Sequence, residues 1–112
     1  MIQIENITAE AHQRHTILFQ ESEVILTLRF YPTVSMWCFD AEYKTSVVSG
    51  MKLSVGVLHM RSRNLPFDFA VIDTLGDVID PFRLDDFETG RCELYMLEPA
   101  DMALIRATPV PI

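Results

Sequence analysis

The chain has 112 residues, enough for one domain with a single core, and its apolar fraction of 49% argues against extended disorder. Sixteen acidic residues against nine basic residues give a net charge of −7, which argues against a nucleic-acid partner or an anionic membrane surface, since both attract clustered Lys and Arg. The N-terminus lacks the basic start and apolar stretch of a signal peptide, and no segment is long enough to span a membrane, so we expect a soluble cytoplasmic protein.

The first half of the chain predicts short strands, because apolar and polar residues alternate with a period of two. Pro32 separates the two most regular runs, since it cannot donate to a strand ladder. We expect these runs to pair with their apolar faces aligned, and a third strand to return beside them. The strands predicted in this half run over Met1–Ile4, His15–Gln20, Glu23–Tyr31, Met36–Tyr43 and Ser46–Ser49. The residues predicted to fill the core from the central hairpin are Leu26, Leu28, Phe30, Trp37 and Phe39.

The second half begins with an irregular segment at residues 50–56, where two glycines suggest a crossing from one sheet to another. The next stretch, Val57–Arg63, is ambiguous, and a helical turn is one alternative. Leu65–Asp73 and Arg91–Leu97 are predicted strands with alternating faces. Between them we expect a turn and then an Asp-rich loop at Ile79–Glu88.

Many short strands at about ten-residue spacing predict an all-β, mainly antiparallel fold, a small sandwich or barrel with little helix. We expect residues 1–112 to form a single β domain, of which residues 104–112 are an extended C-terminal tail. The second face of the central hairpin, with Ile25, Arg29 and Tyr31, is too apolar for plain solvent. Either another sheet of the chain covers that face, which is the preferred expectation, or another protein does.

Acidic residues gather between residues 73 and 88, in and around the predicted loop. Hard cations such as calcium bind several carboxylate oxygens, so this loop is a candidate ion site. The spacing of an EF-hand loop is absent, however. The alternative interpretation is a solvated loop in which Asp side chains form turns by bonding to their own backbone. The acidic residues concerned are Asp73, Asp77, Asp80, Asp85, Asp86 and Glu88.

The histidines and cysteines do not predict a catalytic or metal site. His12 and His15 would face opposite sides of a strand, and His59 has no His or Cys neighbour. Cys38 and Cys92 lie far apart and are interpreted as free thiols that fill apolar positions, although an enzyme using either cysteine is a third hypothesis. No phosphate loop, nucleophile elbow or pair of catalytic carboxylates is present, so we expect no enzymatic activity, no metal and no cofactor.

Several short motifs follow one another along the chain. They are Trp-x-x-Asp at Trp37 and Asp40, Leu-x-x-Gly at Leu53 and Gly56, the strand end Asp73 before Gly76, Asp80-Pro81 with Asp85-Asp86, and Leu94-Tyr95. No single motif is diagnostic, because each is a strand or turn signature. Their order and spacing, over roughly residues 8–103, resemble those of the small baseplate plug proteins of contractile-tailed bacteriophages.

The resemblance implies a virion component of the tail baseplate, packed near the tail axis among hub, tube and spike proteins. It also implies several copies in a symmetric assembly, and presence in the host cytoplasm while tails assemble. Sheet edges are expected to bind neighbouring subunits by strand addition. The residues expected to contact partners are Arg29, Tyr31, Asp80, Phe82, Asp85, Asp86 and Phe87. The alternative function is a small-ligand or calcium-binding β-barrel module that uses the acidic loop at residues 73–88.

Overall fold

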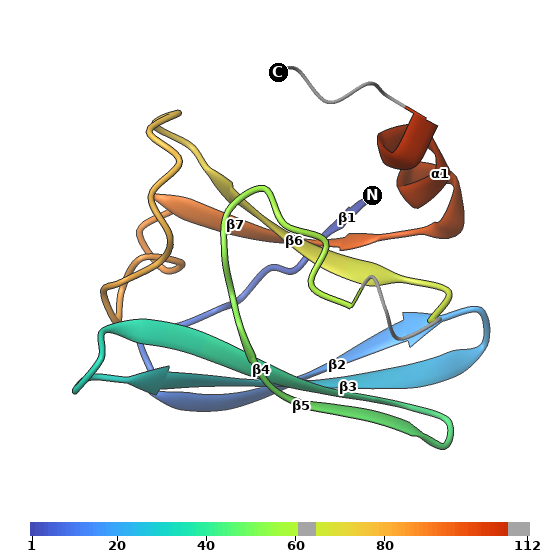
Figure 1. Cartoon of the computed structure of the whole chain (residues 1–112). Helices are drawn as coiled ribbons and strands as arrows, with labels where there is room; N and C mark the ends of the chain where they lie inside the picture. The colour runs from blue at the N-terminus through green and yellow to red at the C-terminus, as the bar shows by residue number, and fades with distance from the viewer. Residues whose placement is uncertain (61–64, 108–112) are drawn as a thin grey trace.

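Two antiparallel sheets lie face to face in the computed structural model, which describes residues 1–60 and 65–107 (Figure 1). The four-stranded sheet is a meander in the order β2-β3-β4-β5, and the three-stranded sheet has the order β1-β7-β6. The prediction of an all-β antiparallel fold is therefore confirmed. The elements are β1 (Ile2–Gln3), β2 (His12–Phe19), β3 (Ser22–Tyr31), β4 (Met36–Tyr43), β5 (Ser46–Lys52), β6 (Asp68–Asp73), β7 (Cys92–Leu97) and the helix α1 (Pro99–Ala107).

The central hairpin pairs β3 with β4 in the register that aligns their apolar faces. Phe30 lies opposite Trp37, and Leu28 lies opposite Phe39. A slip of one residue would turn every apolar side chain of a strand to the wrong face, so burial of one face specifies this register. Four of the expected core residues from this hairpin, Leu26, Leu28, Trp37 and Phe39, are fully buried, and Phe30 is partly buried beside them.

Aromatic rings connect the two sheets through the core. Phe39 of β4 meets Phe69 of β6 edge to face at 5.5 Å between ring centroids, and Phe69 in turn meets Phe67 at 5.7 Å. Phe67 contacts Tyr43 of the other sheet at 5.2 Å. Edge-to-face pairs of this kind add stability beyond their buried area, so these rings tie the sheets together at defined positions.

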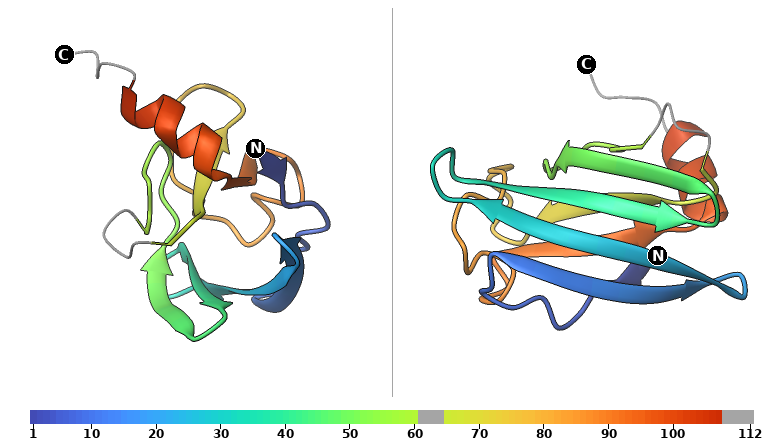
Figure 2. Two further views of the ribbon diagram at one scale, coloured as in Figure 1. Left: turned by 90° about the vertical axis from the view of Figure 1, so that its right-hand side faces the viewer. Right: turned by 90° about the horizontal axis from the view of Figure 1, so that it is seen from below.

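The outer face of the four-stranded sheet is not covered by the second sheet, which packs on the opposite face (Figure 2). The preferred expectation, that a sheet of the same chain covers Ile25, Arg29 and Tyr31, is therefore wrong. Long side chains take part of that role, because Arg29 crosses the outer face to bind Asp40 at 2.8 Å. Tyr31 remains exposed at the end of β3.

The C-terminal region corrects the prediction of an extended tail from residue 104, since helix α1 continues to Ala107. Pro99 occupies the first turn, where a missing N–H costs nothing, and the carboxylate of Asp101 accepts the N–H of Glu98 at 3.0 Å. Residues 108–112 of the expected tail lie outside the described residues. Residues 61–63 of the ambiguous stretch Val57–Arg63 also lie outside them, and residues 57–60 contain a turn rather than a helix.

Candidate interaction surface

One arginine holds the long loop between β6 and β7, at residues 74–91. Arg91 precedes β7, and its guanidinium donates to both carboxylate oxygens of Asp86 at 2.8 Å each. A third contact at 3.4 Å reaches Asp73, the last residue of β6. The side chains of both acids are almost fully buried. A two-pronged Arg–carboxylate pair is strong and directional, so it fixes the loop against the ends of both strands.

The same residues satisfy the backbone of the loop. Arg91 also donates to the carbonyl oxygens of Ile79 at 3.1 Å and Asp80 at 3.0 Å. Asp86 accepts the N–H groups of Phe82 at 2.7 Å and Arg83 at 2.8 Å. Buried backbone groups are costly when unpaired, so these bonds let a segment without regular secondary structure fold tightly.

Asp73 forms a second set of bonds at the beginning of the loop. Its carboxylate accepts the N–H groups of Leu75 at 2.9 Å and Ile79 at 3.0 Å. Asp73 and Asp86 therefore bond to the backbone of their own loop, as the alternative interpretation of the acidic residues predicted, but both carboxylates are buried rather than solvated. Within residues 1–60 and 65–107, no group of three or more His, Cys, Asp or Glu side chains is arranged to hold a metal ion.

The electrostatics of the loop favour ionised carboxylates. Burial alone would raise the pKa of Asp86, but Arg91 and the two backbone donors outweigh it and lower that pKa to about 2. The backbone bonds from Ile79 and Leu75 likewise lower the pKa of Asp73, with a further contribution from Arg91. The hydrogen bond to Asp86 raises the pKa of Arg91, and the charge of Asp73 contributes in the same direction. All three groups are therefore charged at neutral pH, and their attraction is fully present.

Trp37 joins the loop to the central hairpin. Its indole N–H donates to the carbonyl oxygen of Arg83 at 3.0 Å, and its ring meets Phe87 edge to face at 5.6 Å. The expectation that Asp86 and Phe87 contact a partner needs correction, because both side chains are buried inside the chain. Asp86 is occupied by Arg91, and Phe87 packs on the core.

Large apolar side chains are exposed on the outside of this tightly bonded loop. Leu75 is 70% exposed and Val78 is 69% exposed, and the hairpin between β3 and β4 adds exposed side chains at the same end of the sandwich (Figure 1). We call this set the loop-end surface. Its members are Tyr31, Val34, Leu75, Val78, Ile79, Phe82 and Leu84. Large apolar side chains exposed on two loops at one end of a molecule make that end a candidate for protein–protein contact.

Val78 has an unusual backbone conformation, with a φ of 56°. A β-branched residue in this left-handed region is a genuine outlier, because its side chain crowds the neighbouring carbonyl. The adjacent N–H of Ile79 is held by Asp73, so the bonded loop maintains the conformation. Strain of this kind concentrates at sites with a functional role, and here it presents an apolar side chain to solvent.

A comparison with protein families gives a match over residues 1–99 to the family described as cyanophage baseplate Pam3 plug gp18. The chain belongs to this baseplate plug family. A search of curated proteins found no match. The matched residues include the seven strands of the described part of the chain, the Arg91 network and the loop-end surface. Family membership makes the chain a structural component of a phage tail baseplate.

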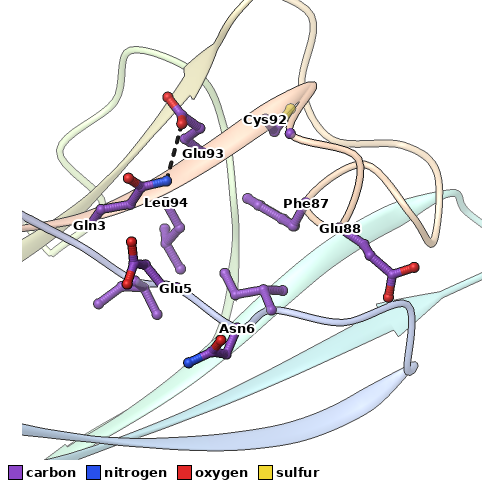
Figure 3. Close-up of a pocket in the computed structure, with 11 residues that line it drawn as sticks. Gln3, Glu5, Asn6, Phe87, Glu88, Cys92, Glu93 and Leu94 are labelled. Carbon is purple, nitrogen blue, oxygen red and sulfur yellow. Dashed lines mark hydrogen bonds between the residues drawn. The ribbon is translucent and has the colours of Figure 1, made fainter.

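A hollow of about 450 Å³ lies between the N-terminal segment and β7 of this plug protein (Figure 3). Among the described residues that line it are three acids, Glu5, Glu88 and Glu93, and none of these described lining residues is Lys or Arg. Gln3 donates to Glu93 at 3.1 Å, as the dashed line in Figure 3 shows. Glu88 accepts the N–H of Ala9 at 2.8 Å, so two of the three acids also hold the N-terminal segment in place.

Cys38, Cys92 and His59 of the plug protein are buried and contribute to its packing. Burial raises the pKa of Cys38 and raises that of Cys92 to about 11, so both remain protonated at neutral pH. His59 accepts the N–H of Ser54 at 2.8 Å, and its other ring nitrogen lies 2.7 Å from the carbonyl oxygen of Phe69. This histidine therefore bridges the segment after β5 to strand β6.

The sequence does not reveal the role of Arg91 in holding the loop, and predicts this residue only as the first residue of the strand Arg91–Leu97. Its partners Asp73 and Asp86 lie far apart in the sequence, so no local pattern distinguishes Arg91 from a surface arginine. The paired acids Asp85-Asp86 in a predicted loop are a partial signal.

None of the described helices is long and apolar enough to cross a bilayer.

Proposed function

We propose that the plug protein is a rigid, non-catalytic part of the baseplate that packs near the tail axis against hub, tube and spike proteins. Several copies would follow the symmetry of the tail, after assembly in the host cytoplasm. The observation that carries the proposal is the loop-end surface, where Leu75 and Val78 are held in solvent by a loop with buried ionic bonds. Because the loop is already ordered, little conformational entropy is lost when a partner covers it.

The expected partner contacts that remain accessible lie at or near this end. Tyr31 and Phe82 belong to the loop-end surface, and Asp85 is exposed between Phe82 and the buried Asp86. Arg29 is partly exposed and bound to Asp40. Asp80 is half-buried, accepts the N–H of Val55 at 2.9 Å and pairs with Lys52 at 3.4 Å. We keep these five as predicted contacts, with the two apolar rings at the centre and the charged groups at the rim.

Calcium binding through the acidic loop is the alternative function. The carboxylates of Asp73 and Asp86 already bind backbone N–H groups and Arg91, so an ion would have to displace those bonds. We therefore expect excess calcium to leave the melting temperature unchanged. A calcium-dependent rise that disappears in the Asp85→Asn, Asp86→Asn variant would favour the alternative.

The proposal is tested in tails purified from the phage that carries the chain. Mass spectrometry should identify the chain in the particles, and high-resolution imaging should place its loop end against another tail protein. The Leu75→Ser, Val78→Ser variant should enter tails poorly. The matched control is Val47→Ser, Val57→Ser, which replaces two apolar side chains outside the loop-end surface that are 60% and 45% exposed. Absence of the chain from particles, or equal incorporation of the two variants, would contradict the proposal.

A further inference from the structure

The two sides of the sandwich differ in how they are closed. On one side the chain itself crosses from β5 to β6 at residues 53–60 (Figure 2). Leu53 donates to the carbonyl oxygen of Trp37 at 2.9 Å, and Val55 then pairs in parallel with Val71 of β6. This crossing segment therefore contacts the backbone of both sheets in turn and bridges them on that side.

The opposite side is bounded by β1 and β2, which are edge strands of their sheets. The carbonyl oxygen of Ala11 accepts the N–H of Phe30 at 2.8 Å. In an antiparallel pair the bonded residues alternate, so the backbone groups of every second residue from Ala11 onward, at positions 13, 15 and 17 of β2, face β3. The groups of the residues between them, Arg14, Thr16 and Leu18, consequently face away from the sheet. The side chains of these three residues are exposed as well.

The same reasoning applies to the edge of the other sheet. Ile4 donates to the carbonyl oxygen of Leu94 at 2.8 Å, in register with the pairing of Ile2 to Met96. The backbone groups of Gln3 and Glu5 therefore face outward. A groove of about 360 Å³ lies between the two edges and is lined by residues 2–6 on one side and 15–18 on the other. Both walls thus offer backbone donors and acceptors that face away from their own sheet.

We propose that an extended segment of a neighbouring baseplate protein inserts into this groove and pairs with the outward-facing backbone groups of Thr16 and Leu18. The inference rests on the proposed function, which supplies the neighbour. Strand addition at a free edge obtains affinity from main-chain hydrogen bonds, and alternate side chains provide specificity. The inserted segment would bridge the sheets on this side, as Val55 does on the other.

The charges favour a neutral or basic segment of a different protein over a second copy of the chain. Each copy has a net charge of −7, so two copies repel one another. Glu5 lines the groove and also the adjoining hollow, whose other acids are Glu88 and Glu93. A basic side chain of the inserted segment can reach these carboxylates, whereas an acidic segment would be repelled.

The test uses a proline that blocks only the outer edge. Thr16 has its N–H directed away from β3, so Thr16→Pro removes a donor for the inserted strand without breaking a native ladder bond. Thr16→Ala keeps the N–H and is the matched control. In tails assembled from each variant, incorporation of Thr16→Pro should fall about tenfold or more relative to Thr16→Ala, since main-chain pairing is lost.

A second measurement needs no substitution. Amide hydrogen exchange of the wild-type peptide containing Thr16 and Leu18 should be fast in the free chain and about a hundredfold slower in purified tails, because pairing protects amides. Imaging of the tail should show an extended segment of another protein beside β2. This measurement decides the question if Thr16→Pro fails to fold.

The outcomes separate this inference from the proposed function. If the chain is found in tails but its β2 edge exchanges as fast as in the free chain, the inference is overturned and the structural role stands. A second copy of the chain in the groove would overturn the choice of occupant. Absence of the chain from tails would remove the proposed function and this inference with it.

Discussion

Replacing Arg91 by Met tests whether the buried ion pairs hold the loop in place. Met preserves an unbranched apolar stem but leaves the carboxylates of Asp73 and Asp86 without their cation, and the side chain of Asp86 is only 3% exposed. Removing one partner of a buried ion pair costs about 3–5 kcal/mol, because the remaining charge has lost its solvation. A domain of this size has a total stability of roughly 5–15 kcal/mol, so the loss should be large.

The assay is urea unfolding followed by fluorescence. Trp37 is the single tryptophan, is fully buried and donates to the loop at Arg83, so its emission reports both core and loop. The matched control is Arg29→Met, which removes a cation that is 43% exposed from its pair with Asp40. Exposed pairs contribute about 0–1 kcal/mol, so this control should unfold close to wild type.

The comparison of the two arginine variants decides the question. If Arg91→Met and Arg29→Met lower the free energy of unfolding by equal, small amounts, Asp86 reaches water once Arg91 is gone. The loop then does not depend on the bonds that Arg91 makes. The double variant Asp86→Asn, Arg91→Met provides a further check. It removes both charges of the closest pair, so it should be more stable than Arg91→Met alone.

Three further predictions concern the core, the pH dependence and the loop. Trp37→Ala should lower the free energy of unfolding, measured by urea unfolding followed by circular dichroism, by about 3–5 kcal/mol, and a loss near zero would contradict the burial of Trp37. Folding lowers the pKa of Asp86 from 3.8 to about 2, so its contribution to the free energy of unfolding is present above pH 4, and roughly 2 kcal/mol is lost as the pH falls towards 2. If Asp86→Asn and the wild type lose stability equally between pH 4 and pH 2, Asp86 is not the origin of the loss. Val78→Asn should raise the melting temperature, because Asn adopts positive φ more readily than Val, and a lower melting temperature would show that φ carries no strain.

The central hairpin could be predicted from sequence because its signal is local. Alternation over β3 and β4 specifies which side chains share a face, and only a short turn separates the strands, so Phe30 meets Trp37 without any distant information. The sequence predicts the ends of other strands less accurately. Strand β5 continues through Gly50 to Lys52 because Asp40 accepts the N–H of Gly50 at 2.8 Å, a contact to the neighbouring strand that no local pattern reveals.

Helix α1 could not be predicted because part of its support lies far away in sequence. Asp101 caps the helix locally, but the same carboxylate also binds the N-terminal amine of Met1 at 2.8 Å. Met102 is buried in the first turns of the helix. Short helices depend on such tertiary contacts more than on intrinsic propensity, so the sequence alone indicates an irregular end.

The candidate surface illustrates a different limit. Their place in a predicted loop made Asp86 and Phe87 expected partner contacts, yet the structure buries both because Arg91 neutralises one and Trp37 packs on the other. The side chains that do reach solvent, Leu75 and Val78, are those that composition would have placed inside. This inversion follows from the bonded loop: Asp73, Asp86 and Arg91 turn inward to satisfy its polar groups, and Leu75 and Val78 are left on its outside.

The free edge of β2 depends on geometry in a similar way. Whether the N–H of Thr16 faces a partner strand or a groove is set by the pairing of Ala11 with Phe30, and a shift of one residue in that pairing would exchange the two sets of backbone groups. Sequence alternation predicts the side-chain faces of a strand but does not reveal which strand lies beyond it. The position of an edge is therefore a property of topology. In this chain the crossing after β5 occupies one side of the sandwich, and β1 and β2 are left as edges on the other, where a neighbour can pair with them.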